Sequence, residues 1–173
     1  MNTRIPRLIF SLCLAPFLLE GRAAEPVSQP PAPVLIFIVR HAEKSAVSGD
    51  VPLSPEGQAR AEKLAAMLAP AEFSAVYSSE LTFAQQTAVP VARQRKLEPI
   101  IVSVRETEKL LAELQKLAPG SVALVVNHSG TIPALVEKLG GAKPSPIEGH
   151  DRLFVVSRQT GGAATVAELR YGE

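Results

Sequence analysis

The chain has 173 residues, of which 46% are hydrophobic and 20% are charged, and its formal net charge is +1. This length suits one domain, and the composition is that of a folded protein and excludes a disordered one. The near-neutral charge provides no basic surface for nucleic acid, so a nucleic-acid partner is not expected. The single cysteine excludes an internal disulfide and a cysteine-rich zinc site. The three histidines are the first residues to consider for chemistry.

The first 24 residues have the pattern of an export signal. Arg4 and Arg7 precede an apolar run over residues 8–19, and two alanines follow at 23–24. The run is short for a membrane span, which needs about 20 apolar residues. We therefore predict a signal peptide over residues 1–24 and a periplasmic or secreted mature protein with no stable membrane insertion. The alternative is an uncleaved N-terminal anchor.

Removal of this segment changes the composition of the chain. It takes away three arginines, one glutamate and the cysteine, which leaves a charge of −1 and no thiol. A chain without cysteine suits an oxidising compartment. Residues 25–33 contain four prolines and predict a stiff, extended linker. Residues 34–173 then form the folded domain.

The folded part begins with a continuous apolar run at residues 34–39, which predicts a strand buried on both faces. Ser54-Pro55-Glu56 then has the pattern of a helix start, with a serine N-cap, a proline at the first helical position and an acid in the first turn. Apolar residues on one face continue this helix until Pro70 ends it.

The remaining elements alternate in the same way. The pattern predicts strands at 74–78, 99–104, 122–126, 153–156 and 165–171, the last two joined by a turn at Gly161-Gly162. It predicts helices from residue 80 with a kink at Pro90, at 106–117 and at 131–139. This alternation predicts an α/β fold, a three-layer αβα sandwich with a mostly parallel central sheet.

Two of the three histidines directly follow predicted strands. Arg40 and His41 close the first strand, and Asn127 and His128 close the strand that ends at 126. Ligands of parallel sheets bind at the carboxyl ends of the strands, so we expect these residues to share one cleft. The alternative is that each histidine only caps its strand.

The chemistry that fits these residue types is attack on phosphorus. A neutral imidazole can act as a nucleophile, and the guanidinium of Arg40 can bind phosphate oxygens through two hydrogen bonds. Backbone amides at the turn around Ser129, before the helix at 131–139, can add donors for an anion. The sequence has no metal-ligand spacing and no glycine-rich nucleotide loop, so we expect neither a metal nor an organic cofactor.

Four sequence blocks, in order along the chain, resemble the histidine phosphatase superfamily, which includes the phosphoglycerate mutases. They are Arg-His-Ala-Glu-Lys at 40–44, Leu-Ser-Pro-Glu-Gly-Gln-Ala at 53–59, the stretch 76–88, and Asn-His-Ser-Gly-Thr-Ile-Pro at 127–133. The resemblance implies a phosphoglycerate mutase-like fold and hydrolysis without metal or cofactor. It also implies that His41 becomes phosphorylated, that Arg40 binds the phosphoryl group, and that His128 hydrogen-bonds this group in the transition state.

The chain departs from the family pattern at one important position. Where the family usually has a second phosphate-binding arginine this chain has Phe83, and Asn127 replaces the usual glycine before the second histidine. Losing one such donor costs about 10²–10³ in rate. Either Phe83 forms an apolar wall for an unusual substrate, or it packs in the core, or the domain binds phosphate without turnover. A further alternative is that another cation fills the gap, and the candidates are Lys44, Arg105 and Arg152. Of the two charged residues in the motif loop, Glu43 and Lys44, Lys44 has the stronger electrostatic case.

The proton donor for the leaving group is open in the sequence. Glu106 is the first candidate, because it most closely follows the third predicted strand. Glu108, Asp151 and, more weakly, His150 are the alternatives. Asp151 is also expected to line the substrate pocket together with Phe83 and Asn127.

The short segment between Phe83 and Pro99 leaves no room for the large cap insertions of bigger family members. We therefore expect an open cleft, as in the small phosphohistidine phosphatases of the SixA type. Such a cleft could take a phosphorylated small molecule, an envelope sugar phosphate or a phosphoprotein. The sequence predicts an exported phosphomonoesterase, with a weak or inactive phosphate- or sugar-phosphate-binding protein as the alternative. Mutase activity is not expected, since a mutase must exclude water behind a cap.

Overall fold

The computed structural model describes residues 31–159 and 164–172. The predicted signal peptide, most of the predicted linker and the turn at Gly161-Gly162 lie outside the described residues. Within the described ranges, no helix is long and apolar enough to cross a membrane. The elements, in chain order, are β1 (Val34–Arg40), α1 (Pro55–Met67), β2 (Ala75–Ser78), α2 (Thr82–Gln94), β3 (Ile100–Ile101), α3 (Thr107–Gln115), β4 (Val122–Asn127), α4 (Ile132–Lys138), β5 (Arg152–Arg158) and β6 (Ala164–Arg170).

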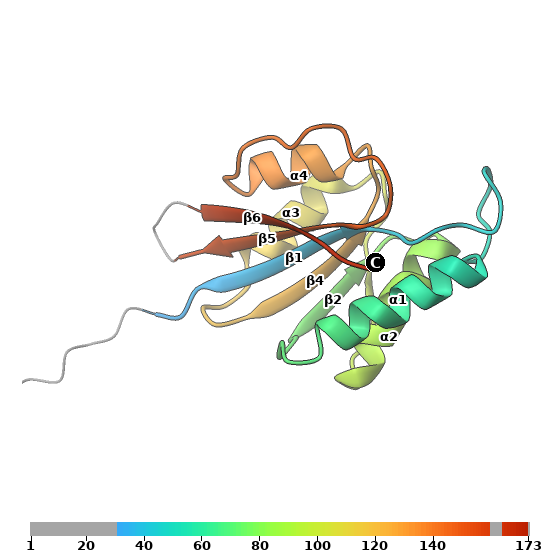
Figure 1. The fold of residues 1–173 in the computed structure, drawn as a ribbon. Coiled ribbons are helices and arrows are strands. Elements are labelled where there is room, and N and C mark those ends of the chain that lie inside the picture. The colour runs from blue at the N-terminus through green and yellow to red at the C-terminus, as the bar shows by residue number, and fades with distance from the viewer. Residues whose placement is uncertain (1–30, 160–163, 173) are drawn as a thin grey trace, which may run out of the picture.

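The strands form one sheet in the order β3-β2-β4-β1-β5-β6. The first four strands in this order are parallel, whereas β5 runs antiparallel to β1 and β6 antiparallel to β5. Helices α1 and α2 cover one face of the sheet, and α3 and α4 cover the other (Figure 1). The predicted three-layer αβα sandwich with a mostly parallel sheet is therefore confirmed, and the described residues contain no large cap.

The apolar run of β1 builds both cores because its side chains alternate between the two faces of the sheet. Ile36 and Ile38 are completely buried with residues of α3 and α4, while Val39 is buried with residues of α1 and α2. A central strand covered on both sides reads as continuously apolar for this reason. The two cores hold the carboxyl end of β1 in a fixed place between β4 and β5.

Several predicted boundaries are wrong: β5 covers Arg152–Arg158 instead of 153–156, and α3 covers Thr107–Gln115 instead of 106–117. The errors at β3 and α2 have a visible cause. Strand β3 is two residues long instead of covering 99–104, and α2 begins at Thr82 instead of residue 80. The Glu80 carboxylate accepts hydrogen bonds from the Val104 backbone N–H, at 2.9 Å, and from the Ser103 hydroxyl, at 3.0 Å. The Glu80 side chain therefore takes the hydrogen bonds of residues 103 and 104, which the pattern predicts as strand. At the start of α2, the Asp50 side chain accepts the Thr82 backbone N–H at 2.6 Å.

Candidate active site

The sheet order places three histidines at one edge. His41 follows β1, His128 follows β4 and His150 precedes β5. Because β5 is antiparallel to β1, its beginning lies at the same edge as the ends of β1 and β4. The ring centroids of His128 and of His150 each lie 5.4 Å from that of His41. His41 and His128 thus lie close together, as expected from the strand ends, and a third imidazole lies beside them.

His41 is buried, with 5% of its surface exposed, and its backbone N–H donates to the Asn127 carbonyl at 3.0 Å. Its ring Nδ1 lies 2.8 Å from the Ala42 carbonyl oxygen. A carbonyl oxygen can only accept, so Nδ1 carries the proton and Nε2 keeps its lone pair. Burial lowers the pKa of His41 to about 4, against the opposing effect of the Ala42 hydrogen bond. The neutral imidazole is therefore the form present at neutral pH, with Nε2 as its basic atom.

Arg40 lies beside this ring and is held by the loop before β5. Its Nη1 donates to the Gly149 carbonyl at 3.0 Å. Its Nε is buried and has no hydrogen-bond partner among the described residues. A half-buried guanidinium whose Nε is unpaired is suited to an anionic ligand, because a phosphate oxygen can complete its hydrogen bonds.

His128 is half-buried at the end of β4. Its Nε2 is hydrogen-bonded to the Ser79 hydroxyl at 2.9 Å. Burial lowers the pKa of His128, and Arg40 and Lys44 lower it further, while the negative charge of Glu80 raises it. Like His41, it is neutral at neutral pH.

Asn127 fixes the turn that carries His128. Its side-chain oxygen accepts the His128 backbone N–H at 3.0 Å and the Thr131 hydroxyl at 2.8 Å. The Asn127 side chain is buried in these contacts, so the structure places it in the support of the turn. Ser129 lies in the same turn, between His128 and α4, and is half-buried.

Phe83 lies inside the histidine cluster. Its ring centroid is 4.3 Å from that of His41, and its ring meets that of His128 edge-on at 5.8 Å. Lys44 Nζ lies 5.1 Å from the Phe83 ring centroid and donates to the Val47 carbonyl at 2.9 Å. Phe83 is thus a buried packing residue whose ring also contacts the histidines. The Lys44 ammonium group lies over the face of this ring.

The other two cations named as replacements for the missing arginine make no contact with Phe83 or the histidines among the interactions of the described residues. Arg105 is exposed. The Arg152 guanidinium is held by the Glu168 carboxylate, with nitrogen–oxygen distances of 2.7 and 3.0 Å, and by backbone carbonyls of the loop before β5. Of the three candidates, Lys44 is the one that the structure places against Phe83.

The carboxylates named as proton donors are engaged in ion pairs of their own. Glu106 pairs with Lys109 at 3.2 Å, and Asp151 pairs with Arg170. Glu108 pairs with Lys138. Within the described ranges, no hydrogen bond or ion pair joins Glu106, Glu108 or Asp151 to the three histidines, so the structure does not bring them into the cluster.

Two residues of the site carry little signal in the sequence. His150 enters the cluster through the antiparallel pairing of β5 with β1, which a loop histidine before a late strand does not reveal. Ser79 contacts His128 across 49 positions of sequence. Ser79 belongs to the block 76–88 that resembles the family, and this is the sequence signal that could have identified it as a site residue. The only sequence signal for His150 is its position before a predicted strand.

The described residues contain no group of three or more histidine, cysteine, aspartate or glutamate side chains that could hold a metal ion.

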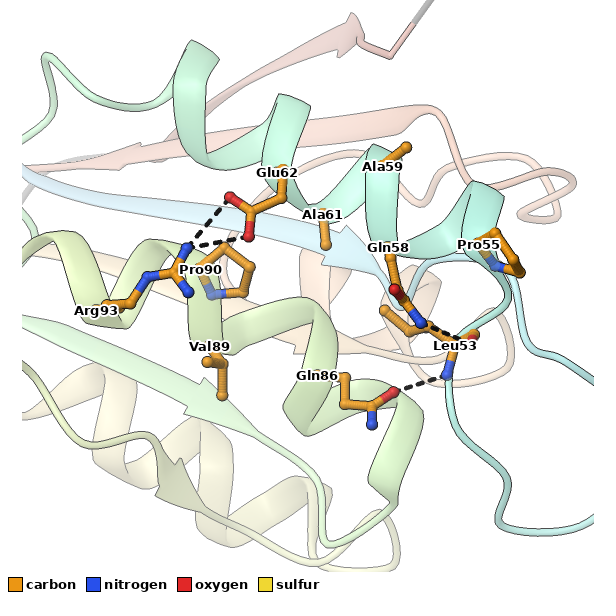
Figure 2. A pocket seen from close by; sticks show the side chains of 10 residues that line it. All are labelled: Leu53, Pro55, Gln58, Ala59, Ala61, Glu62, Gln86, Val89, Pro90 and Arg93. Carbon is orange, nitrogen blue, oxygen red and sulfur yellow. Dashed lines mark hydrogen bonds and ion pairs between the residues drawn. The ribbon is translucent and has the colours of Figure 1, made fainter.

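A groove of about 520 Å³ lies between α1 and α2, and none of the three histidines lines it (Figure 2). Gln58 and Gln86 hydrogen-bond the backbone of Leu53 along it, and the ion pair between Arg93 and Glu62 joins the two helices. The size of this groove does not make it the reactive centre, since the groups suited to phosphoryl transfer lie at the sheet edge.

Comparisons with known proteins agree with this geometry. The model of the Histidine phosphatase superfamily (branch 1) matches residues 36–107. The solved structures similar to this chain include the protein histidine phosphatase SixA complexed with tungstate, at 22% identity over 79% of this chain and 96% of that one, with a TM-score of 0.61. A mycobacterial glucosyl-3-phosphoglycerate phosphatase is similar at 15% identity over 79% and 97%, with a TM-score of 0.63. A phosphoglycerate mutase from Bacillus anthracis is similar at 19% identity over 80% and 93%, with a TM-score of 0.63. Among curated proteins, no sequence matches this chain.

The fold is thus that of the phosphoglycerate mutase-like α/β proteins. The resemblance to the histidine phosphatase superfamily that the motifs predict is confirmed by the family model, whose match covers the Arg40-His41 block and ends just past β3. The family match and the phosphatases among the structural neighbours support a phosphatase function.

Proposed function

We propose that the protein is an exported, metal-independent phosphomonoesterase that works through a phosphohistidine on His41. The observation that carries the proposal is the state of this ring. His41 is buried and neutral, its Nδ1 is fixed by the Ala42 carbonyl, and its Nε2 is basic, while the preceding residue, Arg40, has a guanidinium nitrogen without a partner among the described residues. These are the requirements for a nucleophile that attacks a bound phosphoryl group.

The reaction has two steps. His41 Nε2 attacks phosphorus, a P–N bond forms, and the P–O bond to the leaving group breaks; the leaving oxygen keeps the electron pair and takes a proton from water. Water then loses a proton as its oxygen attacks the same phosphorus, the P–N bond breaks, and inorganic phosphate leaves while the electron pair returns to Nε2. Arg40 binds the phosphoryl oxygens through both steps, and His128 hydrogen-bonds them in the transition state.

Lys44 supplies the second positive charge in this proposal. Its ammonium group lies on the Phe83 face, and Phe83 in turn touches His41 and His128. Its charge also lowers the pKa of His128. Lysine acts as a point charge and does not have the two-pronged geometry of arginine, so we expect slower turnover than an enzyme with two arginines achieves.

The substrate is proposed as a class. An open site without a cap suits a phosphorylated small molecule, an envelope sugar phosphate or a phosphoprotein. The export signal predicted over residues 1–24 places the substrate in the periplasm or outside the cell. The neighbours, one named a protein histidine phosphatase and another a glucosyl-3-phosphoglycerate phosphatase, have unlike substrates, so they do not select among these classes.

The experiment is hydrolysis of p-nitrophenyl phosphate by the purified protein in the presence of EDTA, with His41→Ala as the control. We expect turnover by the wild type and none by the variant. The alternative is a protein that binds phosphate without hydrolysing it, and the departure at Phe83 is what favours it. Absence of turnover in the wild type, together with binding of vanadate, would establish that alternative and overturn the proposal.

A further inference from the structure

His150 occupies a position in the site that mirrors the position of His128. Strand β1 lies between β4 and β5, so His41 has His128 on its β4 side and His150 on its β5 side. Both neighbouring rings have their centroids 5.4 Å from the ring of His41. Phe83 contacts His41 and His128, and therefore closes the β4 side. On the β5 side, the aromatic ring that contacts His41 among the described residues is the imidazole of His150.

The loop that carries His150 is bonded to both residues of the Arg-His pair. His150 Nδ1 lies 2.6 Å from the backbone carbonyl oxygen of His41, and the carbonyl of Gly149 accepts from Arg40. Gly149 has a φ of +67°, a backbone conformation that residues other than glycine rarely adopt. This turn accompanies the contacts of the Gly149 carbonyl with Arg40 and of the His150 side chain with His41. A further hydrogen bond holds the end of this loop, since the backbone N–H of Tyr171, the residue after β6, donates to the Asp151 carbonyl at 2.9 Å.

These contacts determine which ring nitrogen of His150 is basic. Nδ1 must donate, because its partner is a carbonyl oxygen, so Nε2 keeps a lone pair. No hydrogen bond to this Nε2 occurs among residues 31–159 and 164–172. Burial lowers the pKa of His150, Arg40 and Arg60 lower it further, and the hydrogen bond to His41 and the charge of Glu43 raise it. The ring is therefore neutral at neutral pH, and its Nε2 is free to take a proton.

The second step of the proposed reaction needs such a group. The attacking water must lose a proton as its oxygen bonds to phosphorus. Of the carboxylates named as proton donors, Glu106 pairs with Lys109 and Asp151 pairs with Arg170, while Nε2 of His128 is bonded to Ser79. His150 Nε2 is the unengaged basic nitrogen beside His41 in the described part of the chain.

Resting on the proposed phosphohistidine reaction, we propose that His150 is a catalytic residue of its second step, the general base for the water that hydrolyses phosphorylated His41. Water oxygen bonds to phosphorus, the P–N bond to His41 breaks, and the proton of the water moves to His150 Nε2. Phosphate departs, and His150 passes the proton to solvent. Removing a general base typically lowers the rate of its step by about 10²–10⁴-fold.

The test uses His150→Asn, because the asparagine amide can keep the donor that binds the His41 carbonyl while the basic Nε2 is lost. In rapid mixing with p-nitrophenyl phosphate, we expect the variant to release a first equivalent of p-nitrophenol at the wild-type rate and then to turn over about 10²–10⁴-fold more slowly. Phosphorylated enzyme accumulates as a result. His150→Ala loses both the donor to the His41 carbonyl and the basic Nε2. Added imidazole is expected to restore part of the rate of the second step in this variant. Glu148→Gln, an exposed change in the same loop, is the matched control and is expected to behave as wild type.

Two results would overturn the assignment. One is wild-type steady turnover by His150→Asn without accumulation of phosphorylated enzyme. The other is an equal loss of the first-equivalent rate and of turnover, which is the behaviour of a residue that only positions His41. Failure of the phosphohistidine reaction itself is a different observation, since it appears as missing turnover in the wild-type protein.

Discussion

The two sides of His41 are built from different parts of the sheet. On the β4 side, parallel strands bring His128 and the Phe83–Lys44 pair to the ring. On the β5 side, an antiparallel strand brings a loop whose backbone and imidazole bond Arg40 and His41. The β4 side offers positive charge and donors, which suit a phosphoryl group, whereas the β5 side offers a free basic nitrogen. The comparison suggests a division of work in which the β4 side promotes phosphorylation of His41 and the β5 side promotes its hydrolysis.

The largest effect that separates the two sides is expected from His128→Asn. Loss of one donor to the transferring phosphoryl group should lower the rate of the first step by about 10²–10³-fold. Stopped-flow measurement of the first equivalent of p-nitrophenol checks this, with thermal melting as the control for folding. Release of the first equivalent of p-nitrophenol at the wild-type rate, followed by slow steady turnover, would place His128 in the second step. That result would contradict the separate roles of the β4 and β5 sides.

The next effect concerns the positive charge on the β4 side. Lys44→Gln should weaken binding of vanadate about tenfold, because a hydrogen bond to a charged group contributes about 1.5 kcal/mol or more. Lys44→Arg should preserve it. Titration with vanadate measures both variants. Equal affinity of Lys44→Gln and the wild type would show that the ammonium on Phe83 does not reach the anion.

A third prediction concerns pH and tests the neutral state of the cluster. The pKa of His41 is lowered from 6.5 to about 4, so the unfolded chain binds a proton between these values that the folded chain excludes. Stability is therefore complete above pH 6.5 and is lost as the pH falls toward 4. After allowance for partial solvent screening, His41 accounts for about 1–2 kcal/mol of this loss. The pKa values of His128 and His150 are lowered too, so they act in the same direction.

Urea unfolding at pH 7 and at pH 4.5 measures this loss. His41→Gln should lose less stability between the two pH values than the wild type does, because its side chain does not titrate. An identical loss in both proteins would mean that His41 is not held neutral by the fold.

The smallest effect is expected at the loop that carries Lys44. Asp50 accepts the Thr82 backbone N–H at 2.6 Å and its hydroxyl at 3.1 Å, so it joins this loop to the start of α2. Asp50→Ala removes the acceptor at the helix start and should cost about 1 kcal/mol of stability. Asp50→Asn should cost less. Denaturant unfolding compares the two, and equal stability of Asp50→Ala and the wild type would contradict the role.

Much of the fold follows from local pattern. The apolar run of β1 and the Ser54-Pro55-Glu56 start predict their elements correctly, because burial on both faces and helix capping are properties of adjacent residues. The Ser54 hydroxyl accepts the Gly57 N–H at 3.1 Å, as a serine N-cap does. The short β3 could not be predicted, since it depends on the reach of the Glu80 side chain across 24 positions.

The site divides in the same way. His41 and His128 are predictable because both follow apolar strands of a parallel sheet, whose carboxyl ends meet. His150 and Asp151 are neighbours in sequence, and the pattern cannot say which of them faces the site. Antiparallel pairing of β5 and the turn at Gly149 decide it, with the imidazole beside His41 and the carboxylate beside Arg170.

The central claim is that His41 carries the phosphoryl group, and trapping that intermediate tests it most directly. The protein is mixed with a ³²P-labelled phosphate monoester in the presence of EDTA and quenched in alkali, in which phosphohistidine is stable, and the labelled peptide is identified by mass spectrometry. The account predicts acid-labile label on His41 and more of it in His150→Asn. Turnover with label on another residue, or with no label on the protein in either form, would contradict it.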